Sequence, residues 1–209
     1  MKQCADSIRV VHPLFQVDGG GSIPTSALQL KISKIYYDKF KVLNELWHSR
    51  LPTCTNCFCG VCFGAVFNNI YYAVAWWSHP IAQNRLKNGY NMYELRRLAI
   101  SDDAPPNTAS RMLRIMKNII KNSMPHIVWL ISYQDTDVHQ GTIYKAAGWY
   151  SKGETKFVSW KNRPGRSDLS AANKVRWECQ IRNPISVINE DSKDNTQQTN
   201  VVIQESLFE

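Results

Sequence analysis

The sequence lacks a long uninterrupted apolar segment and the pattern of a secretory leader. No stretch approaches the ~18 consecutive apolar residues that a membrane-spanning helix needs, so we expect no membrane association. The first residues, MKQCADSIRVVHPLF, contain no apolar block followed by small residues, so we expect no signal peptide. These absences predict a cytoplasmic protein whose cysteines are reduced thiols.

Acidic residues are scarce: 17 Asp and Glu stand against 25 Lys and Arg, which gives a formal net charge of +8. Residues 183–209 contain one Lys and five acids, so they carry −4 and residues 1–182 carry +12. The polar composition of residues 183–209 predicts a flexible acidic tail behind one domain, residues 1–182. A basic domain attracts polyanions, most often nucleic acid, although an ordinary basic protein fits the composition as well.

Internal repeats are also absent, and the 209 residues, 44% of them hydrophobic, suffice for one well-cored domain. Apolar runs and turn signals predict strands near residues 28–32, 57–67, 70–77, 93–100, 126–133, 155–160 and 175–180. The Asn68-Asn69 pair predicts a hairpin turn between the second and third of these strands.

Three helices are expected between these strands. The first follows an N-cap at Ser33, ends before Pro52, and has an apolar face of Tyr36, Phe40, Leu43 and Trp47. The second buries residues 112–119, and a short third covers residues 142–147. The resulting fold class is α/β, with a mixed, mostly antiparallel central sheet flanked by helices. A right-handed crossover predicts that strands 93–100 and 126–133 are parallel.

The segment APPNTASR, residues 104–111, joins a predicted strand to the second helix. A helix N-terminus exposes unpaired N–H groups and the positive end of the helix dipole, which suits a phosphate. Asn107, Thr108 and Ser110 are small and polar enough to let a phosphate approach. They are equally typical of an ordinary capped helix start.

Four cysteines, Cys54, Cys57, Cys59 and Cys62, have the spacing of a metal site. They coincide with a predicted strand on which Cys57 and Cys59 face one side and Cys62 the other. Because such a strand cannot wrap four thiolates around one ion, we expect packed free thiols rather than zinc or iron.

Five segments resemble the phage Mom family, which belongs to the GNAT acyltransferases. They are WHSRLP (47–52), YELRRL (93–98), PNTAS (106–110), ISYQD (131–135) and GTIYKAAGW (141–149). The last resembles the tyrosine-bearing segment of GNAT enzymes in general, whereas the loop at residues 105–110 lacks the glycine of their usual phosphate loop. The resemblance implies a GNAT-like fold.

The resemblance also implies a function. Mom proteins modify the exocyclic amine of adenine in double-stranded phage DNA to an N6-methylcarbamoyl derivative, which protects that DNA from restriction in the cytoplasm of the bacterial host. It implies an acetyl-CoA donor, with iron as a further cofactor proposed within the family. Two alternatives stay open: a GNAT enzyme that acetylates a protein or small-molecule amine, and a non-catalytic DNA-binding protein on a decayed acyltransferase fold.

Carried over by position, the resemblance implies that His48, Asp135 and Tyr144 are catalytic, with Tyr144 as the general acid. The residues that it implies for cofactor binding are Arg96, Arg97, Asn107, Thr108 and Ser110. Taken on their own, Tyr144 can be a core tyrosine and His48 a helix cap. Arg96 and Arg97 are neighbours on a strand, so we expect one to contact a phosphate and the other to face away.

Adenine in a duplex must be flipped out before its amine can react, and a flipped base stacks on aromatic rings. Trp76, Trp77, Trp149 and Tyr150 are candidates, although we expect most of them in the core. The end of the tail, QESLFE, resembles the peptide that binds bacterial sliding clamps. We expect Gln204, Ser206, Leu207 and Phe208 to dock there, which would tether the enzyme to replicating DNA. The sequence makes no prediction about the oligomeric state.

Overall fold

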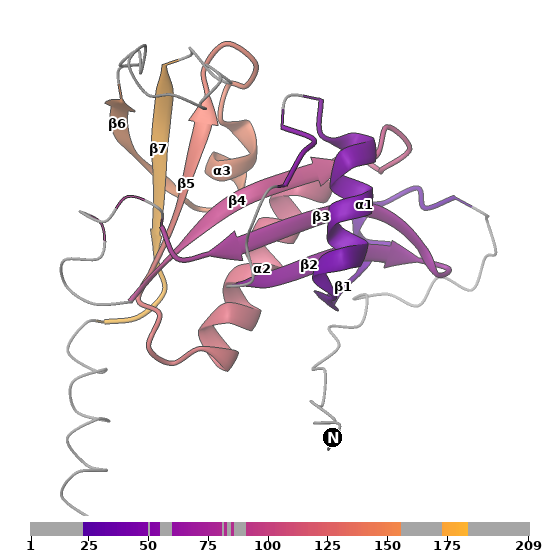
Figure 1. Ribbon diagram of the computed structural model, residues 1–209, viewed down its shortest axis with the longest axis horizontal. Coiled ribbons are helices and arrows are strands. Elements are labelled where there is room, and N and C mark those ends of the chain that lie inside the picture. Colours follow the sequence, from indigo (N-terminus) through magenta and orange to yellow (C-terminus); the bar gives the residue numbers. More distant parts are fainter. Residues whose placement is uncertain are drawn as a thin grey trace, which may run out of the picture.

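The structure, a computed structural model, describes residues 23–49, 51–54, 60–80, 82, 85, 91–155 and 173–183. This part forms a seven-stranded sheet with the strand order β1-β2-β3-β4-β5-β7-β6. Strands β4 and β5 are parallel, and all other neighbours are antiparallel. The mixed, mostly antiparallel sheet between helices confirms the predicted fold class (Figure 1).

The strands are β1 (Lys31–Ile35), β2 (Val61–Phe67), β3 (Ile70–Ser78), β4 (Met92–Ile100), β5 (Trp129–Asp135), β6 (Tyr150–Thr155) and β7 (Lys174–Gln180). The helices are the 3-10 turn η1 (Ala27–Gln29), α1 (Tyr37–Trp47), α2 (Thr108–Ser123) and α3 (Thr142–Ala146). Within the described residues no helix combines the length and apolarity that a membrane crossing requires.

Helices α1 and α2 cover opposite faces of the sheet (Figure 1), and each encloses its own apolar core. The larger core lies under α2, whose side chains Met112, Met116 and Ile120 are fully buried. The smaller core lies under α1 and is built around Phe40 and Trp76. Full burial of each large apolar side chain contributes about 1.5–3 kcal/mol, so both helices are anchored to the sheet.

The predicted hairpin is confirmed. Strands β2 and β3 pair in antiparallel register around a turn at Asn68 and Asn69. Both residues have positive φ, 48° and 65°, the conformation that a two-residue type I′ turn requires. Asn tolerates this left-handed region better than most residues, which explains the turn.

The start of the first helix was predicted wrongly. Ser33 is not an N-cap but lies in β1, where it pairs with Gly64 of β2, so the strand continues to Ile35. The helix begins at Tyr37, and Tyr36 is 88% exposed rather than part of the apolar face. Phe40 is buried as predicted, and the helix ends at Trp47, before Pro52.

Two strands differ from the prediction in position. Strand β5 covers Trp129–Asp135 rather than residues 126–133. Strand β6 covers Tyr150–Thr155, so the prediction of a strand at 155–160 was displaced, and residues 156–172 lie outside the described part. The predicted tail, from residue 184 onward, lies outside it as well.

The parallel strands β4 and β5 separate partway along their length. Their register joins Met92–Leu95 to Trp129–Ser132, whereas β4 continues to Ile100 and β5 to Asp135. Figure 1 shows the two strands diverging like the arms of a V, with α3 beside the arm formed by β5. This opening positions the candidate site.

Candidate active site

A cavity of about 520 Å³ lies at the divergence of β4 and β5. It is lined by side chains from the end of α1, from β4, β5 and α3, and from the loop between β5 and α3. The structure brings five of the predicted site residues to its wall: His48, Arg96, Arg97, Asp135 and Tyr144. The lining also includes exposed residues, Ser49 on one side and residues 138–140 on another, so the cavity opens to the surface.

A second cavity, of about 270 Å³, lies at the start of α2. The other three predicted residues, Asn107, Thr108 and Ser110, line it. The two cavities have four lining residues in common: Ile100, Ala109, Thr142 and Ile143. They therefore adjoin, and a ligand that starts at the tip of α2 can reach the wall formed by Tyr144.

The tip of α2 is built so that its backbone donors stay available. Asn107, the N-cap, adopts the left-handed conformation with φ 67°, and its side chain makes no capping bond. The Thr108 hydroxyl donates to the Pro105 carbonyl at 2.6 Å, and the Ser110 hydroxyl donates to the Asn107 carbonyl at 3.1 Å. The Thr108 N–H also donates to the Pro105 carbonyl, at 3.3 Å. The donors left for a phosphate are therefore the backbone N–H groups of Ala109 and Ser110.

Tyr144 is buried, and its hydroxyl lies 2.8 Å from the Ser132 hydroxyl of β5. Burial raises the pKa of Tyr144, and the hydrogen bond with Ser132 opposes that shift. The phenol therefore stays protonated at neutral pH, which is the form that a general acid needs. It is also a core tyrosine, since it packs in the apolar cluster under α2.

Tyr144 is held in place by three residues outside the predicted set: Ser132, Gln134 and Trp177. The Trp177 ring of β7 stacks on the Tyr144 ring with centroids 5.3 Å apart and an angle of 12°. Trp177 Nε1 donates to Gln134 Oε1 at 2.7 Å, and Gln134 Nε2 donates to the His139 carbonyl. Ser132 and Gln134 alternate with Tyr133 and Asp135 in the ISYQD segment. Polar residues on the buried side of a strand need hydrogen-bond partners, and this pattern could have indicated their role.

His48 is the C-cap of α1 and lines the larger cavity at the same time. Its Nδ1 accepts the Leu51 N–H at 3.3 Å. Burial lowers its pKa to about 4, with contributions from the positive charges of Arg97 and His139. The ring is therefore neutral near pH 7, and because Nδ1 is an acceptor, Nε2 carries the proton and is a donor rather than a base.

The segment that carries His48 is fixed by a buried amide. Asn44 of α1 is fully buried and donates from Nδ2 to the carbonyls of Leu51 and Pro52, at 3.2 and 2.8 Å. These bonds hold Leu51 and Pro52 against the helix. Asn44 was missed because a polar residue four positions after Phe40 breaks the apolar pattern instead of extending it.

Asp135 is the last residue of β5 and lies at the cavity wall. Its Oδ1 accepts the Asp137 N–H at 3.0 Å, and its carbonyl accepts the His139 N–H at 3.1 Å. Lys174 of β7 lies opposite in the register and also lines the cavity. The carboxylate is thus held at the point where the loop to α3 begins.

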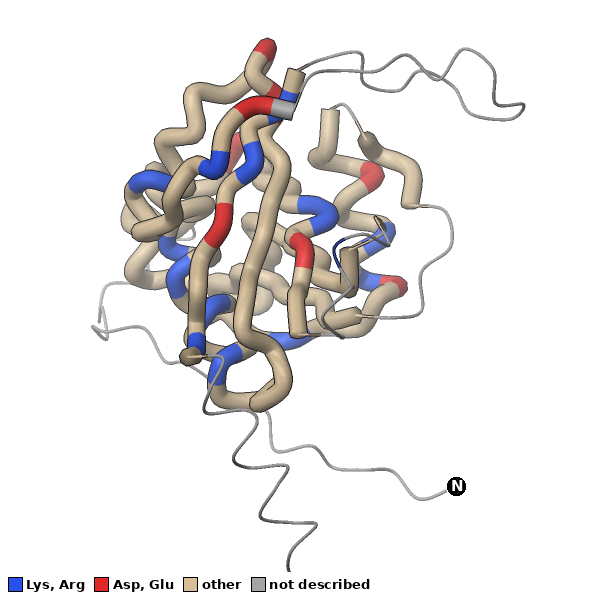
Figure 2. Tube along the Cα trace, turned by 90° about the vertical axis from the view of Figure 1, so that its left-hand side faces the viewer, with Lys and Arg blue, Asp and Glu red and all other residues tan. Residues whose placement is uncertain are grey.

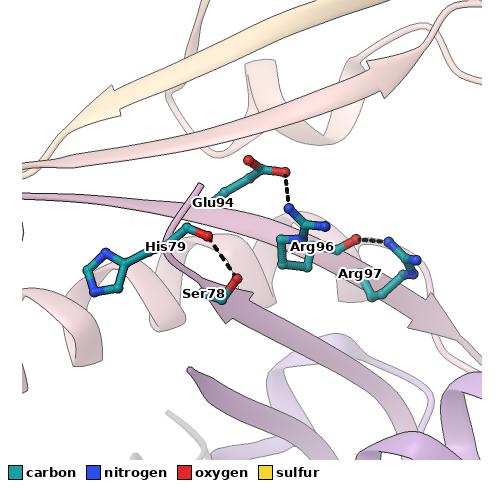
Figure 3. A network of polar contacts seen from close by, with 5 residues as sticks. All are labelled: Ser78, His79, Glu94, Arg96 and Arg97. Atoms are coloured by element: carbon teal, nitrogen blue, oxygen red, sulfur yellow. Dashed lines mark hydrogen bonds and ion pairs between the residues drawn. The ribbon is translucent and has the colours of Figure 1, made fainter. Parts of the chain in front are cut away.

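The expectation that Arg96 and Arg97 face opposite sides was wrong. In the register of β3 with β4, Trp76 pairs with Arg97 and Trp77 with Leu95, so Arg96 is the extra residue of a β-bulge. Arg96 lies over the Trp76 ring, 5.8 Å from its centroid, and Arg97 contacts Cys54. Trp76 and Cys54 both belong to the core under α1. The bulge therefore turns both guanidinium groups to the α1 face of the sheet (Figure 3).

The described cysteines of the cluster and the three tryptophans among the stacking candidates are core residues. Cys54 and Cys62 are buried free thiols, and burial raises the pKa of both, that of Cys62 to about 12. Cys57 and Cys59 lie outside the described residues. Among the described residues no group of three or more His, Cys, Asp and Glu is placed to hold a metal ion. Trp76, Trp77 and Trp149 are buried and Tyr150 is 40% exposed; none of these four lines the cavity.

A family comparison matches residues 30–199 of the chain to the Mom protein family. This range contains both cavities and all eight predicted site residues. A comparison with curated protein sequences found no match.

Solved structures with the same fold are acetyltransferases. A Bacillus subtilis acetyltransferase in complex with CoA superposes with a TM-score of 0.53 at 12% identity, covering 72% of this chain and 98% of its own. The ribosomal-protein-S18-alanine N-acetyltransferase of Escherichia coli gives 0.52 at 11% identity, with 73% and 94% covered. A GNAT-family acetyltransferase of Streptococcus pneumoniae gives 0.53 at 12% identity, with 73% and 99% covered. At these identities the likeness shows a shared GNAT fold.

Proposed function

The chain belongs to the Mom protein family, and on that premise we propose that it is a transferase that modifies the exocyclic amine of adenine in DNA. An acyl-CoA-type donor supplies the acyl carbon, the new bond forms at the adenine amine, and CoA leaves as its thiol. The N6-methylcarbamoyl product contains one nitrogen more than an acetyl group, so an amine co-substrate has to supply that nitrogen. The modification protects phage DNA from restriction. The observation that carries this proposal is the family match over residues 30–199.

The tip of α2 fits a donor that carries phosphates. Asn107 leaves the first-turn N–H groups without a side-chain cap, and the small residues of the loop leave space for a phosphate. Similarity to an acetyltransferase solved in complex with CoA supports the same choice of donor. Bound acyl-CoA would supply an activated acyl carbon.

The larger cavity offers groups suited to the transfer. Tyr144 holds a proton on its phenol oxygen at neutral pH and can give it to a leaving group. Asp135 offers a carboxylate that can orient an amine or accept its proton. His48 offers Nε2 as a hydrogen-bond donor beside them. No step in this proposal requires a metal ion.

The adenine has to enter the cavity from the duplex. Its amine is a poor nucleophile because the lone pair is delocalised into the ring, so it must be held close to the donor. Flipping costs a few kcal/mol, which stacking inside the protein can offset. Tyr133, partly exposed at the cavity wall, replaces the predicted stacking candidates in this role.

Mass spectrometry of nucleosides tests the proposal. DNA from bacterial cells that co-express the protein should contain a modified deoxyadenosine, and DNA from cells that express Tyr144→Phe or Asp135→Ala should not. Circular dichroism of the purified variants checks that both fold. Unmodified deoxyadenosine with the folded wild type refutes the proposal; a newly acetylated protein or small-molecule amine then indicates the alternative acetyltransferase.

A further inference from the structure

Two arginines of β4 line the cavity, and the carboxylate of Glu94 on the same strand pairs with one of them. Arg96 Nη1 pairs with Glu94 Oε1 at 3.1 Å, and the two side chains are only 14% and 13% exposed. Arg97 Nη1 donates to the Arg96 carbonyl at 2.7 Å, which draws the second guanidinium beside the first (Figure 3). We refer to Arg96 and Arg97 as the arginine pair.

Among the described residues, the two guanidinium groups of the arginine pair share one ion pair, that of Arg96 with Glu94. Burial raises the pKa of Glu94 and lowers the pKa of Arg97, and the charge of Arg96 lowers that of Arg97 further. His48 adds no negative charge, since it is neutral near pH 7. A buried charge without a counter-charge is costly, so this arrangement favours an anion as ligand.

The arginine pair also has donors to offer that ligand. The Nε–H of each guanidinium is buried and makes no hydrogen bond with any described residue. Arginine presents its N–H groups as a planar fork, which matches the oxygens of a phosphate. Trp76 packs under Arg96, which fixes the plane of that fork.

The face of the sheet on which the arginine pair lies distinguishes a CoA phosphate from a phosphate of another ligand. The tip of α2, where a CoA phosphate would lie, belongs to the α2 face, and Leu95, Leu98 and Ile100 of β4 point to that side. The arginine pair points to the α1 face because of the bulge. It is therefore on the opposite side of β4 from the donor phosphates.

Resting on the proposed function, we propose that the arginine pair binds one backbone phosphodiester of the DNA, next to the adenine that enters the cavity. A phosphodiester carries one negative charge, which matches the one surplus charge of Arg96, Arg97 and Glu94. The overall charge of the protein would not select this place, since basic residues lie on both sides of the sheet, Lys39 and Lys41 on α1 and Arg111, Arg114, Lys117 and Lys121 on α2 (Figure 2).

The test measures DNA binding and CoA binding separately. Fluorescence anisotropy with a labelled adenine-containing duplex, over a series of salt concentrations, compares the wild type with Arg96→Gln and Arg97→Gln. Each variant should bind the duplex about tenfold more weakly, with the slope of log affinity against log salt reduced by about one. Calorimetry with CoA should give an unchanged affinity.

Two further variants sharpen the test. Arg114→Gln removes the same charge from the exposed side of α2 and should change DNA affinity by less than about twofold. Glu94→Gln removes the competing carboxylate and should strengthen DNA binding, a gain that misfolding cannot produce. A duplex in which one phosphate next to the target adenine is replaced by a neutral methylphosphonate should bind the wild type more weakly than the unsubstituted duplex does. Arg97→Gln should bind the two duplexes equally.

Weaker CoA binding with unchanged DNA binding in the two arginine variants would mean that the pair binds the donor, which overturns the inference. Unchanged binding of both ligands overturns it too. Failure of the proposed function has a different signature, because it leaves the DNA of cells expressing the wild type unmodified. Modified DNA together with normal binding by Arg96→Gln and Arg97→Gln rejects the inference alone.

Discussion

At the scale of single residues, the site depends on groups whose charge state is set by burial. Tyr144 is kept protonated and His48 is kept neutral near pH 7. Desolvation is the first cause of both shifts, so the cavity itself selects the protonation states. The protonation states of Tyr144 and His48 should therefore stay the same across physiological pH.

The low pKa of His48 predicts a loss of stability in acid. The folded protein favours the neutral ring, so this contribution is fully present above the ordinary pKa of 6.5 and is lost as the pH falls toward about 4. Urea unfolding at about pH 7 and about pH 4.5 should show a larger loss of unfolding free energy for the wild type than for His48→Asn. Equal losses would mean that His48 does not titrate in this range.

Gly141 predicts a mutation that disturbs the support of Tyr144. An added Cβ would collide with the Trp177 ring and lie 2.5 Å from Gln134 Oε1, and the φ of 74° is unfavourable for other residues. Gly141→Ala should lower the free energy of unfolding by about 1–3 kcal/mol in a urea titration and abolish transfer activity.

Gly148→Ala is the matched control for that change. Its φ of 77° is similar, but no atom lies within 4 Å of the added Cβ. It should therefore cost only the backbone strain of about 1–2 kcal/mol and keep the activity. The same loss of activity in both variants would contradict a role for the contact between Gly141 and Trp177.

At the scale of elements, local sequence patterns predicted which helices and strands form but misplaced several of their boundaries. The hairpin of β2 and β3 and the parallel pair of β4 and β5 were predicted, because turn chemistry and crossover handedness are local or general rules. Strand β6 was displaced, since its sequence YSKGET has little apolar alternation and forms a strand by pairing with β7 at the sheet edge.

The bulge at Arg96 shows why the site was predicted in composition but not in geometry. The residues that line the cavity come from motifs, which a single sequence displays. Which face a side chain takes depends on how β4 pairs with β3, and no periodicity inside YELRRL reveals that extra residue. Trp177 was missed for a related reason, since it stacks on Tyr144, a residue distant in sequence.

The left-handed conformation of Asn107 at the start of α2 leads to a prediction about CoA binding. Its φ of 67° replaces the conformational freedom that a glycine would provide in the loop. Asn107→Gly should keep CoA affinity, whereas Asn107→Ala should lower the unfolding free energy by about 1 kcal/mol and weaken CoA binding several-fold. Calorimetry with CoA compares the two variants, and equal affinities would show that the loop conformation does not matter for the donor.

At the scale of the whole molecule, charge is divided along the chain. Residues 1–182 carry +12 and residues 183–209 carry −4, so a polyanion is attracted to the body and repelled by the tail. We propose that an acidic segment carrying the predicted clamp peptide holds the enzyme near DNA without competing for the proposed DNA-binding surface.

The clamp peptide stays a prediction, because residues 204–209 lie outside the described part. Deleting residues 204–209 should abolish pull-down of the chain by a bacterial sliding clamp, since Leu207 and Phe208 would no longer fill its apolar pocket. Glu205→Ala, at the position that departs from the motif, should preserve the pull-down. Retention of the clamp by the truncated chain would reject this docking.

Because the pairing of β4 with β5 ends at Leu95 and Ser132, hydrogen exchange in these strands can report whether the cavity between them holds a ligand. Past Leu95 and Ser132, the main-chain amides that point into the opening have no acceptor on the facing strand, whereas the other amides of these segments pair with β3 or β7. The deuterium uptake of the amides in the opening therefore depends on what fills it. Ligand in that space should slow exchange in residues 96–100 and 133–135. The amides between Met92 and Leu95 should exchange slowly whether or not ligand is bound.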